Sequence, residues 1–229
     1  MIISNNYYYF TKALDDNVCD KILELGKEKL KTSGIMAGTF DKRGIEEENS
    51  NIEYQGDKTQ QEVSDNAMVR DSKICWLGDN DNEKWLYELL QPYLHTANQE
   101  SGWKFHWDWS ESIQFTEYGL NQFYGWHYDG GSDHNCVFKD GPEGGRGKVR
   151  KLSMTVNLSK PEDYEGGNLK FDWGPHQKES QGPRFKECTE IRPRGSIIVF
   201  PSFMYHQVTP VTRGVRYSLV MQNRGNPFV

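Results

Sequence analysis

Hydrophobic residues in the first hundred positions recur mainly at the spacing of an α-helix. Acidic and amide residues at 15–17 form a helix-start signal, and the apolar positions after them predict an amphipathic helix over 16–31. A second helix is predicted over 85–97, and we expect Pro92 inside it to introduce a kink. The apolar positions are Val18, Ile22, Leu25 and Leu30 in the first helix and Trp85, Leu86, Leu89, Leu90, Tyr93, Leu94 and Ala97 in the second. We expect both helices to pack against the outside of a sheet.

From Trp103 onward the hydrophobic period changes to two, which is the period of a β-strand. Phe105, Trp107 and Trp109 alternate with polar residues, and segments 2–10 and 69–77 earlier in the chain are also β-prone. Later strand candidates, separated by glycine-containing turns, are residues 151–158, 168–173, 197–200, 206–211 and 215–222. Many short strands with regular turns predict a sandwich or barrel. The predicted fold class is therefore mainly β with supporting helices.

Two polar stretches interrupt this pattern. Residues 41–66 are acidic and polar, and we predict a surface loop there. Residues 130–148 are rich in glycine and charge, and a loop of that length is typical of either a lid or a disordered segment. Because no linker divides the chain, we predict a single domain over 1–229, with helical support and a loop in 1–102 and the β core in 103–229.

Composition narrows the classes of protein that fit. The 229 residues carry a net charge of −6, which argues against a nucleic-acid partner. The four cysteines are far apart and form no Cys-x-x-Cys pair, so we expect reduced thiols rather than disulfides or a structural zinc site. No apolar run is long enough to span a membrane, and no signal peptide is apparent. We therefore predict a cytoplasmic protein without a membrane partner, and the sequence leaves its oligomeric state open.

The stretch 122–129, Gln-Phe-Tyr-Gly-Trp-His-Tyr-Asp, carries the main candidate chemistry. On a strand, His127 and Asp129 would point to the same side because residues two apart share a face. One imidazole and one carboxylate are two thirds of the 2-His-1-carboxylate triad that binds non-haem iron. The best candidate for the third ligand is His206, far downstream.

Other histidines offer weaker alternatives. His106 and Asp108 repeat the same spacing, but no other feature of a site accompanies them. We expect His95, His134 and His176 to be structural or exposed, although His134 is close to the main motif in the sequence. The pair at 127 and 129 is therefore the preferred metal site.

A predicted hairpin supports this choice. If 212–214 forms the turn between 206–211 and 215–222, His206 faces Val220 and Pro210 faces Arg216. Directly opposed residues share a face, so His206, Arg216 and Ser218 would point the same way. Arg216 would then be placed to hold a carboxylate at some distance from the metal.

The motifs from residue 113 to 228 resemble the Fe(II)/2-oxoglutarate dioxygenases, in particular the prolyl-4-hydroxylase-like, PKHD-type branch. The resemblance rests on His127, Asp129 and His206, and on stretches 150–159, 163–169, 195–203, 210–214 and 216–218. It implies a double-stranded β-helix, or jelly-roll, with iron bound by those three residues. It also implies that Arg216 and Tyr118 bind 2-oxoglutarate. Thr155, Asn157 and Ser218 are further predicted contacts of 2-oxoglutarate, and Ser153 lies on the same pocket-lining face as Thr155 and Asn157. Asn157 and Gln222 stand where this branch commonly has tyrosine and tryptophan.

The activity implied by this resemblance is hydroxylation of an unactivated C–H bond. Fe(II), 2-oxoglutarate and O₂ would be required, succinate and CO₂ would be released, and ascorbate is a further candidate cofactor. A prolyl residue of a peptide or protein is the favoured substrate. Tyr124, Trp126 and Tyr128 flank the ligands and are candidates to stack on its ring. A small-molecule or free amino-acid oxygenase and a non-enzymatic metal-binding jelly-roll are the alternatives.

Overall fold

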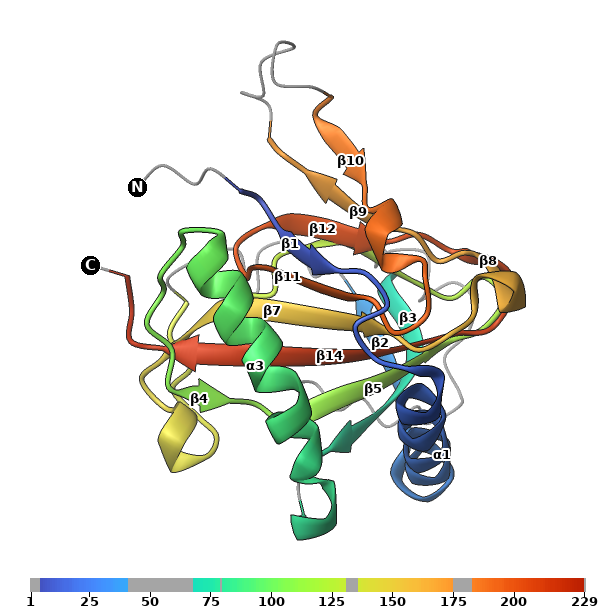
Figure 1. Cartoon of the computed structure of the whole chain (residues 1–229), viewed down its shortest axis with the longest axis horizontal. Coiled ribbons are helices and arrows are strands. Elements are labelled where there is room, and N and C mark those ends of the chain that lie inside the picture. Colours follow the sequence, from blue (N-terminus) through green and yellow to red (C-terminus); the bar gives the residue numbers. More distant parts are fainter. Residues whose placement is uncertain (1–4, 41–67, 79, 131–135, 175–182, 229) are drawn as a thin grey trace.

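The computed structural model describes residues 5–40, 68–78, 80–130, 136–174 and 183–228. A long, curled antiparallel sheet forms the body of the protein, and two helices cover one side of it (Figure 1). The helices are α1 (Asp16–Ser33) and α3 (Trp85–Glu100). The strands are β1 (Tyr8–Phe10), β2 (Ile35–Phe40), β3 (Met68–Leu77), β4 (Trp109–Ser110), β5 (Ile113–Tyr118), β6 (Phe123–His127), β7 (Val149–Asn157), β8 (Tyr164–Gly166), β9 (Leu169–Asp172), β10 (Phe185–Glu187), β11 (Ile197–Pro201), β12 (Tyr205–Val208), β13 (Val211–Gly214) and β14 (Arg216–Gly225).

The strand order explains how the sheet curls. Its path runs β1-β11-β7-β14-β5-β3-β6-β12-β9-β10, with β2 and β4 paired at the side and β13 paired to β8 in a separate two-stranded sheet. Strand β3 pairs with β5 through residues 73–77 and with β6 through Arg70 and Asp71. It therefore joins a larger half, made of β1, β11, β7, β14 and β5, to a smaller half, made of β6, β12, β9 and β10. The predicted jelly-roll with helices outside is confirmed, although β1, β2 and β3 also extend the sheet into the first hundred residues.

Both helices begin and end close to their predicted positions. The Asp15 carboxylate caps α1 by accepting a hydrogen bond from the backbone N–H of Val18 at 2.9 Å, and Gly34 ends the helix. Helix α3 continues through Pro92. The kink predicted at that residue stays a prediction.

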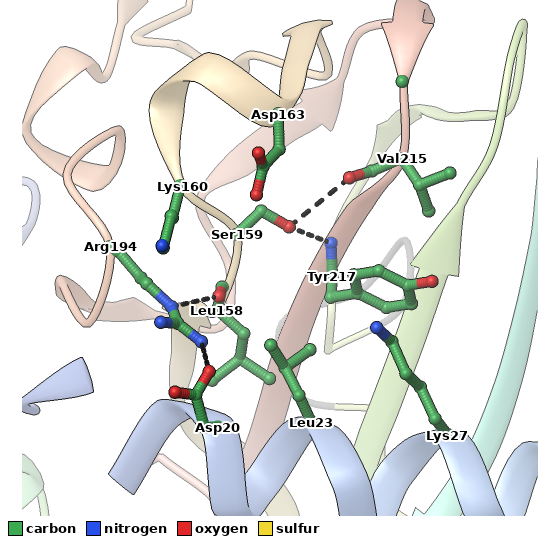
Figure 2. A pocket seen from close by; sticks show the side chains of 11 residues that line it. Asp20, Leu23, Lys27, Leu158, Ser159, Lys160, Asp163, Arg194, Val215 and Tyr217 are labelled. Carbon is green, nitrogen blue, oxygen red and sulfur yellow. Dashed lines mark hydrogen bonds and ion pairs between the residues drawn. The ribbon is translucent and has the colours of Figure 1, made fainter. Parts of the chain in front are cut away.

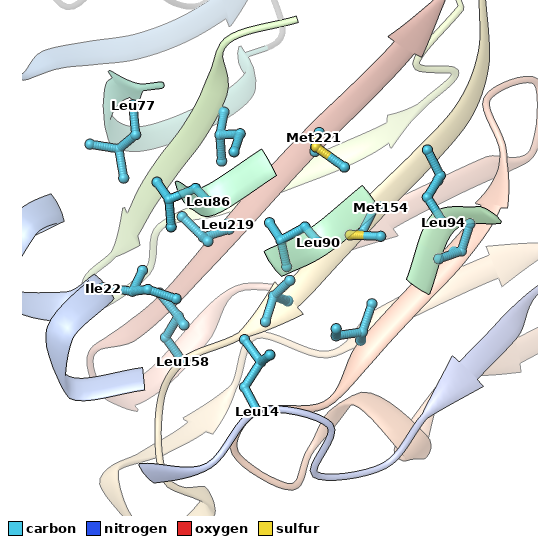
Figure 3. Close-up of a cluster of buried hydrophobic side chains, with 14 of the residues drawn as sticks. Leu14, Ile22, Leu77, Leu86, Leu90, Leu94, Met154, Leu158, Leu219 and Met221 are labelled. Carbon is cyan, nitrogen blue, oxygen red and sulfur yellow. The ribbon is translucent and has the colours of Figure 1, made fainter. Parts of the chain in front are cut away.

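A large apolar core lies between these helices and the strands of the larger half (Figure 3). Ile22 from α1 and the leucines of α3 meet β-strand residues such as Met154 and Leu219. Because side chains alternate along a strand, the residues between these apolar positions face the opposite, inner side of the sheet. Except for Val220, the inner positions in the middle of β7 and β14 are polar: Ser153, Thr155, Asn157, Arg216, Ser218 and Gln222.

The alternating aromatic stretch 103–108 is not a strand, contrary to the prediction. Its backbone bonds to the end of α3 instead: the N–H groups of Lys104 and Phe105 donate to the backbone and side-chain oxygens of Asn98 at 3.1 and 3.0 Å. Lys104 has a left-handed backbone with φ of 51°, which breaks an extended strand. Trp103 and Phe105 enter the core from an irregular segment, and the strand pattern begins only at Trp109.

The predicted hairpin between 206–211 and 215–222 is also wrong. Strand β12 pairs with β6 and β9, whereas β14 pairs with β4, β5 and β7. Between them, β13 leaves the main sheet to pair with β8, and Gly214 at φ 72° lies where a Cβ would overlap the Asp163 carbonyl. The chain thus crosses from one half of the jelly-roll to the other instead of turning back on itself.

The loop predictions have mixed outcomes. Residues 41–66 lie outside the described residues, as do 131–135 within the second loop. In the described part of that loop, Phe138 and Lys148 form an isolated antiparallel β-bridge. Gly144 and Gly145 lie against the ring of Trp109. None of the four cysteines, all of which the structure describes, takes part in a disulfide. None of the described helices is long and apolar enough to cross a membrane.

Candidate metal centre

The candidate metal ligands come from two neighbouring strands of the smaller half. His127 at the end of β6 pairs directly with His206 on β12. The next pair is Val208 with Tyr124, so β6 uses three residues where β12 uses two. This extra residue is a β-bulge, which redirects side chains locally. It allows the Tyr124 and His127 rings to stack with their centroids 3.5 Å apart.

Backbone carbonyls hold both imidazoles in one orientation. His127 Nδ1 bonds to the Gly125 carbonyl at 2.7 Å and His206 Nδ1 bonds to the Met204 carbonyl at 2.9 Å. A proton on each Nδ1 leaves each Nε2 as a lone-pair donor, an arrangement usual for metal-bound histidine. The two Nε2 atoms point at one carboxylate: His127 Nε2 is 3.5 Å from Asp129 Oδ1, and His206 Nε2 is 3.6 Å from Oδ2.

Burial and charge favour the protonation states that a metal needs. Burial is the main cause that lowers the pKa of His206 to about 4, so this imidazole is neutral near pH 7. Burial alone would raise the pKa of Asp129, but the two imidazoles and Arg150 outweigh it and hold that pKa below its usual range. The site therefore presents a neutral His206 imidazole and an ionised Asp129 carboxylate beside the His127 ring. The ligand atoms of His127, Asp129 and His206 lie within 4.8 Å of one another. Among the described residues, this is the one group of three or more possible metal ligands that lie so close together.

This donor set fits a divalent first-row metal. Two imidazoles and one carboxylate match the 2-His-1-carboxylate triad, which leaves coordination positions open for other ligands. Aromatic rings shield the site from one side: Phe200 on β11 lies with its centroid 4.8 Å from that of His206. The prediction that His127, Asp129 and His206 come together is thus supported by their geometry.

A buried ion-pair cluster supports Asp129 from outside the triad. Arg150 on β7 donates from Nη1 to the Asp129 carbonyl at 2.7 Å and holds Glu111 through two further bonds of 2.6 and 2.8 Å. Arg224 on β14 donates to the same Glu111 carboxylate at 2.6 Å. Burial alone would raise the pKa of Glu111, but the two guanidinium groups lower it to about 2. The backbone of the central ligand is therefore fixed by β7 and β14 together.

Arg216 is a buried cation without an acidic partner among the described residues. Its side chain is 2% exposed, its Nη1 lies 3.5 Å from Ser218 Oγ, and its guanidinium lies over the Tyr118 ring at 5.7 Å. Strand pairing places Arg216 beside Tyr118 and Ser218 beside Thr116. Charged groups are rarely buried unless they are paired, so this position suits a bound anion.

The other residues expected to contact 2-oxoglutarate differ in their surroundings. Ser218 pairs with Asn157, and Thr155 pairs with Val220, on neighbouring strands of the inner face. The Asn157 amide donates to the carbonyls of Ser159 and Arg192 at 3.0 and 2.9 Å, which indicates a structural role. The ligand contacts of Tyr118, Ser218, Thr155 and Asn157 stay predictions.

The inner face also contains two residues for which the sequence predicted no role, Gln222 and Arg70. Ser153 donates to Gln222 Oε1 at 2.7 Å, so a residue that departs from the family pattern is bonded into the pocket wall. Arg70 on β3 is buried and lies over the Tyr124 ring, 4.5 Å from its centroid. The sequence gave little signal for Arg70, because one arginine in a strand pattern is ordinary.

The alternative His-x-Asp pair belongs to no cluster of three possible metal ligands among the described residues. His106 and Asp108 lie in the irregular segment, and Asp108 forms an ion pair with Lys148 at 2.7 Å. His95 lies against the Trp107 ring, with their centroids 4.7 Å apart. The remaining candidates, His134 and His176, lie outside the described residues.

A separate hollow lies on the outer surface between α1 and the start of β14 (Figure 2). Two of the cations that line it have partners: Arg194 forms ion pairs with Asp16 and Asp20, and Lys27 lies over the Tyr217 ring at 4.6 Å. The Ser159 hydroxyl accepts a hydrogen bond from the Tyr217 N–H at 2.7 Å. This surface holds α1 against the sheet and carries no evident chemistry.

Comparison with known proteins agrees with the geometry. Residues 113–221 match the model of the 2OG-Fe(II) oxygenase superfamily. The PKHD-type hydroxylase YbiX of Escherichia coli O1:K1 / APEC is 35% identical over 109 residues, which are 47% of this chain. The same segment spans only 40% of that relative's length. The match therefore concerns the β core with the triad.

Two solved structures share the fold over nearly the whole chain. The viral collagen prolyl hydroxylase vCPH from Paramecium Bursaria Chlorella virus-1, in a 2OG complex, aligns with a TM-score of 0.60 at 18% identity, covering 97% of both chains. A prolyl hydroxylase from Trichoplax adhaerens, in complex with a hypoxia inducible factor peptide fragment, aligns with a TM-score of 0.60 at 15% identity, covering 96% of this chain and 84% of that one. The segment 113–221, which contains the His-Asp-His centre, thus matches the 2OG-Fe(II) oxygenase superfamily in sequence, and the two solved structures share the fold of the chain.

Proposed function

We propose that this protein is an Fe(II)- and 2-oxoglutarate-dependent dioxygenase that hydroxylates an unactivated C–H bond. The observation that carries the proposal is a cluster of two imidazoles and one carboxylate inside a jelly-roll. The inner face of that jelly-roll also contains a buried arginine with no acidic partner among the described residues. A structural metal site has no need of such a cation, so the non-enzymatic alternative is disfavoured.

The residues of this chain would bind and orient the reactants. Nε2 of His127, Nε2 of His206 and one oxygen of Asp129 would hold Fe(II), with Arg150 fixing the Asp129 backbone. When bound, Fe(II) would couple O₂ activation and the oxidation of 2-oxoglutarate to succinate and CO₂ with hydroxylation of the substrate. Arg216 would orient the cosubstrate through its free carboxylate, because a guanidinium can grip a carboxylate with two parallel hydrogen bonds.

The proposed primary substrate is a prolyl residue of a peptide or protein. Support comes from the likeness to a PKHD-type hydroxylase and from the fold shared with prolyl hydroxylases, one of them solved with a peptide fragment. Fold likeness is a weaker warrant for substrate than for reaction type. A small-molecule or free amino-acid substrate is therefore the alternative. Ascorbate binding and a cytoplasmic location stay predictions.

The decisive experiment measures succinate formed from 2-oxoglutarate with added Fe(II) in the presence and absence of O₂. We expect O₂-dependent succinate in the wild type and its loss in Asp129→Ala and His206→Ala variants. Asp108→Ala, which changes the second His-x-Asp pair, should retain activity. If Asp129→Ala formed succinate at the wild-type rate, the assignment of the iron ligands would be refuted.

The substrate is tested by comparing proline-rich peptides with free proline as stimulators of the same reaction. Under the peptide proposal, a peptide raises succinate formation, and mass spectrometry finds one added oxygen atom (about 16 Da) on a proline. If free proline stimulates turnover and no peptide does, the small-molecule alternative replaces the peptide proposal.

A further inference from the structure

Arg70 is a second buried cation of the jelly-roll interior that has no acidic partner among the described residues. Only 8% of the Arg70 surface is exposed to solvent. Nε donates to Ser72 Oγ at 2.9 Å and Nη2 donates to Gln114 Oε1 at 2.7 Å, and both acceptors are neutral. A guanidinium has five N–H groups, so these bonds use two of them. Burying a charge is costly unless an opposite charge or a ligand compensates it.

The position of Arg70 connects it to the metal centre. It lies in the part of β3 that passes from the larger half of the sheet to the smaller half, where it pairs with Tyr124. The guanidinium lies 4.5 Å from the centroid of the Tyr124 ring, and that ring stacks on His127 at 3.5 Å. A single aromatic ring thus separates the guanidinium from a metal ligand. An anion bound to Arg70 would lie beside the reacting centre.

Arg70 and Arg216 are on different walls of the interior. Arg216 starts β14 and pairs with Tyr118 on β5, whereas Arg70 is on β3, on the other side of β5 in the strand order. Under the proposed function, 2-oxoglutarate places one carboxylate at the metal and the other at Arg216. The Arg70 guanidinium then has no anion from the cosubstrate, although its contacts with Ser72 and Gln114 hold it in one orientation.

We propose that Arg70 binds a carboxylate of the primary substrate and so selects anionic substrates. This inference rests on the proposed function and adds a specificity-determining residue to it. The carboxylate can belong to a free α-carboxyl group, as in proline or a C-terminal prolyl residue, or to an acidic side chain next to the modified residue. In both cases the Arg70 guanidinium would bind the carboxylate, and the Tyr124 ring would lie between that carboxylate and His127.

The test compares probes that differ only in charge, by calorimetric titration of protein loaded with Mn(II) and 2-oxoglutarate without O₂. One pair is N-acetyl-proline and N-acetyl-prolinamide, and the other is acetyl-Gly-Pro-Asp-amide and acetyl-Gly-Pro-Asn-amide. In at least one pair we expect the acid to bind roughly tenfold to hundredfold more tightly than its amide, because a hydrogen bond to a charged group is lost. The pair that shows the difference identifies the source of the carboxylate.

Variants assign the preference to Arg70. Arg70→Gln should abolish it, Arg70→Lys should retain part of it, and Arg213→Gln, which removes an exposed arginine paired with Glu165, should not change it. If Arg70→Gln does not fold, as judged by circular dichroism, the Arg70→Lys variant carries the comparison. Equal affinity for acid and amide in both pairs, no binding of either acid, or a preference that survives in Arg70→Gln would overturn the proposal.

The two proposals fail in different ways. If the wild type binds neither Mn(II) nor 2-oxoglutarate, the proposed function fails before any probe is added. If both bind and Arg70→Gln weakens 2-oxoglutarate binding while the acid preference is unchanged, Arg70 is a cosubstrate residue and only the substrate inference falls.

Discussion

At the scale of single residues, the interior of this jelly-roll separates two kinds of buried arginine. Arg150 is paired with Glu111 and fixes the backbone of Asp129, so its charge is neutralised within the fold. Arg216 and Arg70 face only neutral described groups. A buried pair contributes to structure, whereas a buried cation with neutral neighbours is suited to a ligand of opposite charge. This difference separates the support of the site from its recognition groups.

Replacing Arg216 by lysine should weaken 2-oxoglutarate binding roughly tenfold to hundredfold, because lysine keeps the charge but loses the two-pronged contact with a carboxylate. Titration of 2-oxoglutarate into Mn(II)-loaded protein measures the change. Mn(II) affinity should remain close to that of the wild type, since Arg216 is not a metal ligand. Unchanged 2-oxoglutarate affinity would show that the cosubstrate anchor lies elsewhere.

The sequence pointed to three candidate metal ligands that the fold does bring together, but it said little about their surroundings. His127 and Asp129 could be found because a strand period of two is visible in one sequence, and His206 because it stands in a recognisable downstream motif. Tyr124 looked equivalent to Trp126 and Tyr128, but the bulge on β6 places its ring against His127. A bulge leaves no clear mark in the hydrophobic pattern, and the place of Arg70 depends on strand pairing across the whole fold.

At the scale of elements, one glycine allows helix α1 to pack closely against the sheet. Gly26 is buried, and a Cβ there would overlap the ring of Phe115 on β5. The Gly26 carbonyl also accepts a hydrogen bond from the Cys75 thiol of β3 at 3.5 Å. The helix therefore packs at its closest where it has no side chain.

Gly26→Ala should destabilise the protein by about 1–3 kcal/mol, because the overpacking cost exceeds the gain of about 1 kcal/mol in helix propensity. Chemical denaturation measures the free energy of unfolding. Glu24→Ala, at an exposed position of the same helix, is the matched control and should change stability little. Equal stability of Gly26→Ala and the wild type would mean that α1 can shift away from Phe115 at low cost.

The ion-pair cluster of Glu111, Arg150 and Arg224 should make stability depend on pH. The pKa of Glu111 is lowered from 4.5 to about 2 in the folded state, so its contribution is fully present above about pH 5. It is lost as the pH falls toward 2, since the unfolded chain takes up the proton first. The stability advantage of the wild type over Glu111→Gln should therefore shrink by about 2 kcal/mol between pH 7 and pH 3. Urea unfolding of both proteins at the two pH values checks this, and a constant difference would contradict it.

The elements themselves were only partly predictable. Local periodicity predicted both helices and most long strands, since each of these buries one continuous face. It failed for 103–108, where aromatic alternation occurs without strand pairing, because Asn98 takes up the backbone groups of Lys104 and Phe105. It also failed for the 206–222 hairpin, because pairing between distant strands is decided by the curl of the sheet.

At the scale of the whole molecule, the metal centre lies in the smaller half of the sheet and is supported from the larger one. His127 and His206 are on β6 and β12, while Phe200 on β11 and Arg150 on β7 approach the site from the larger half. The prediction of a jelly-roll thus placed the triad correctly even though the predicted path from His206 to Arg216 was wrong. The curl of the sheet, and not a local hairpin, gives both residues access to the same interior.

Because the three ligands come together only in the folded chain, metal binding should stabilise the whole protein. A ligand that binds only the folded state at about a hundredfold excess over its Kd adds about 2.7 kcal/mol, which corresponds to a rise in Tm of roughly 5–10 °C for a chain of this size. Mn(II) should produce this shift in the wild type without O₂ or cosubstrate, and a chelator should reverse it. Asp129→Ala should lose the shift, since the two imidazoles remain without the carboxylate. Asp108→Ala should keep it, because Asp108 is paired with Lys148 outside the triad. A metal-dependent rise in Tm that persists in Asp129→Ala and disappears in Asp108→Ala would move the metal site to the other His-x-Asp pair.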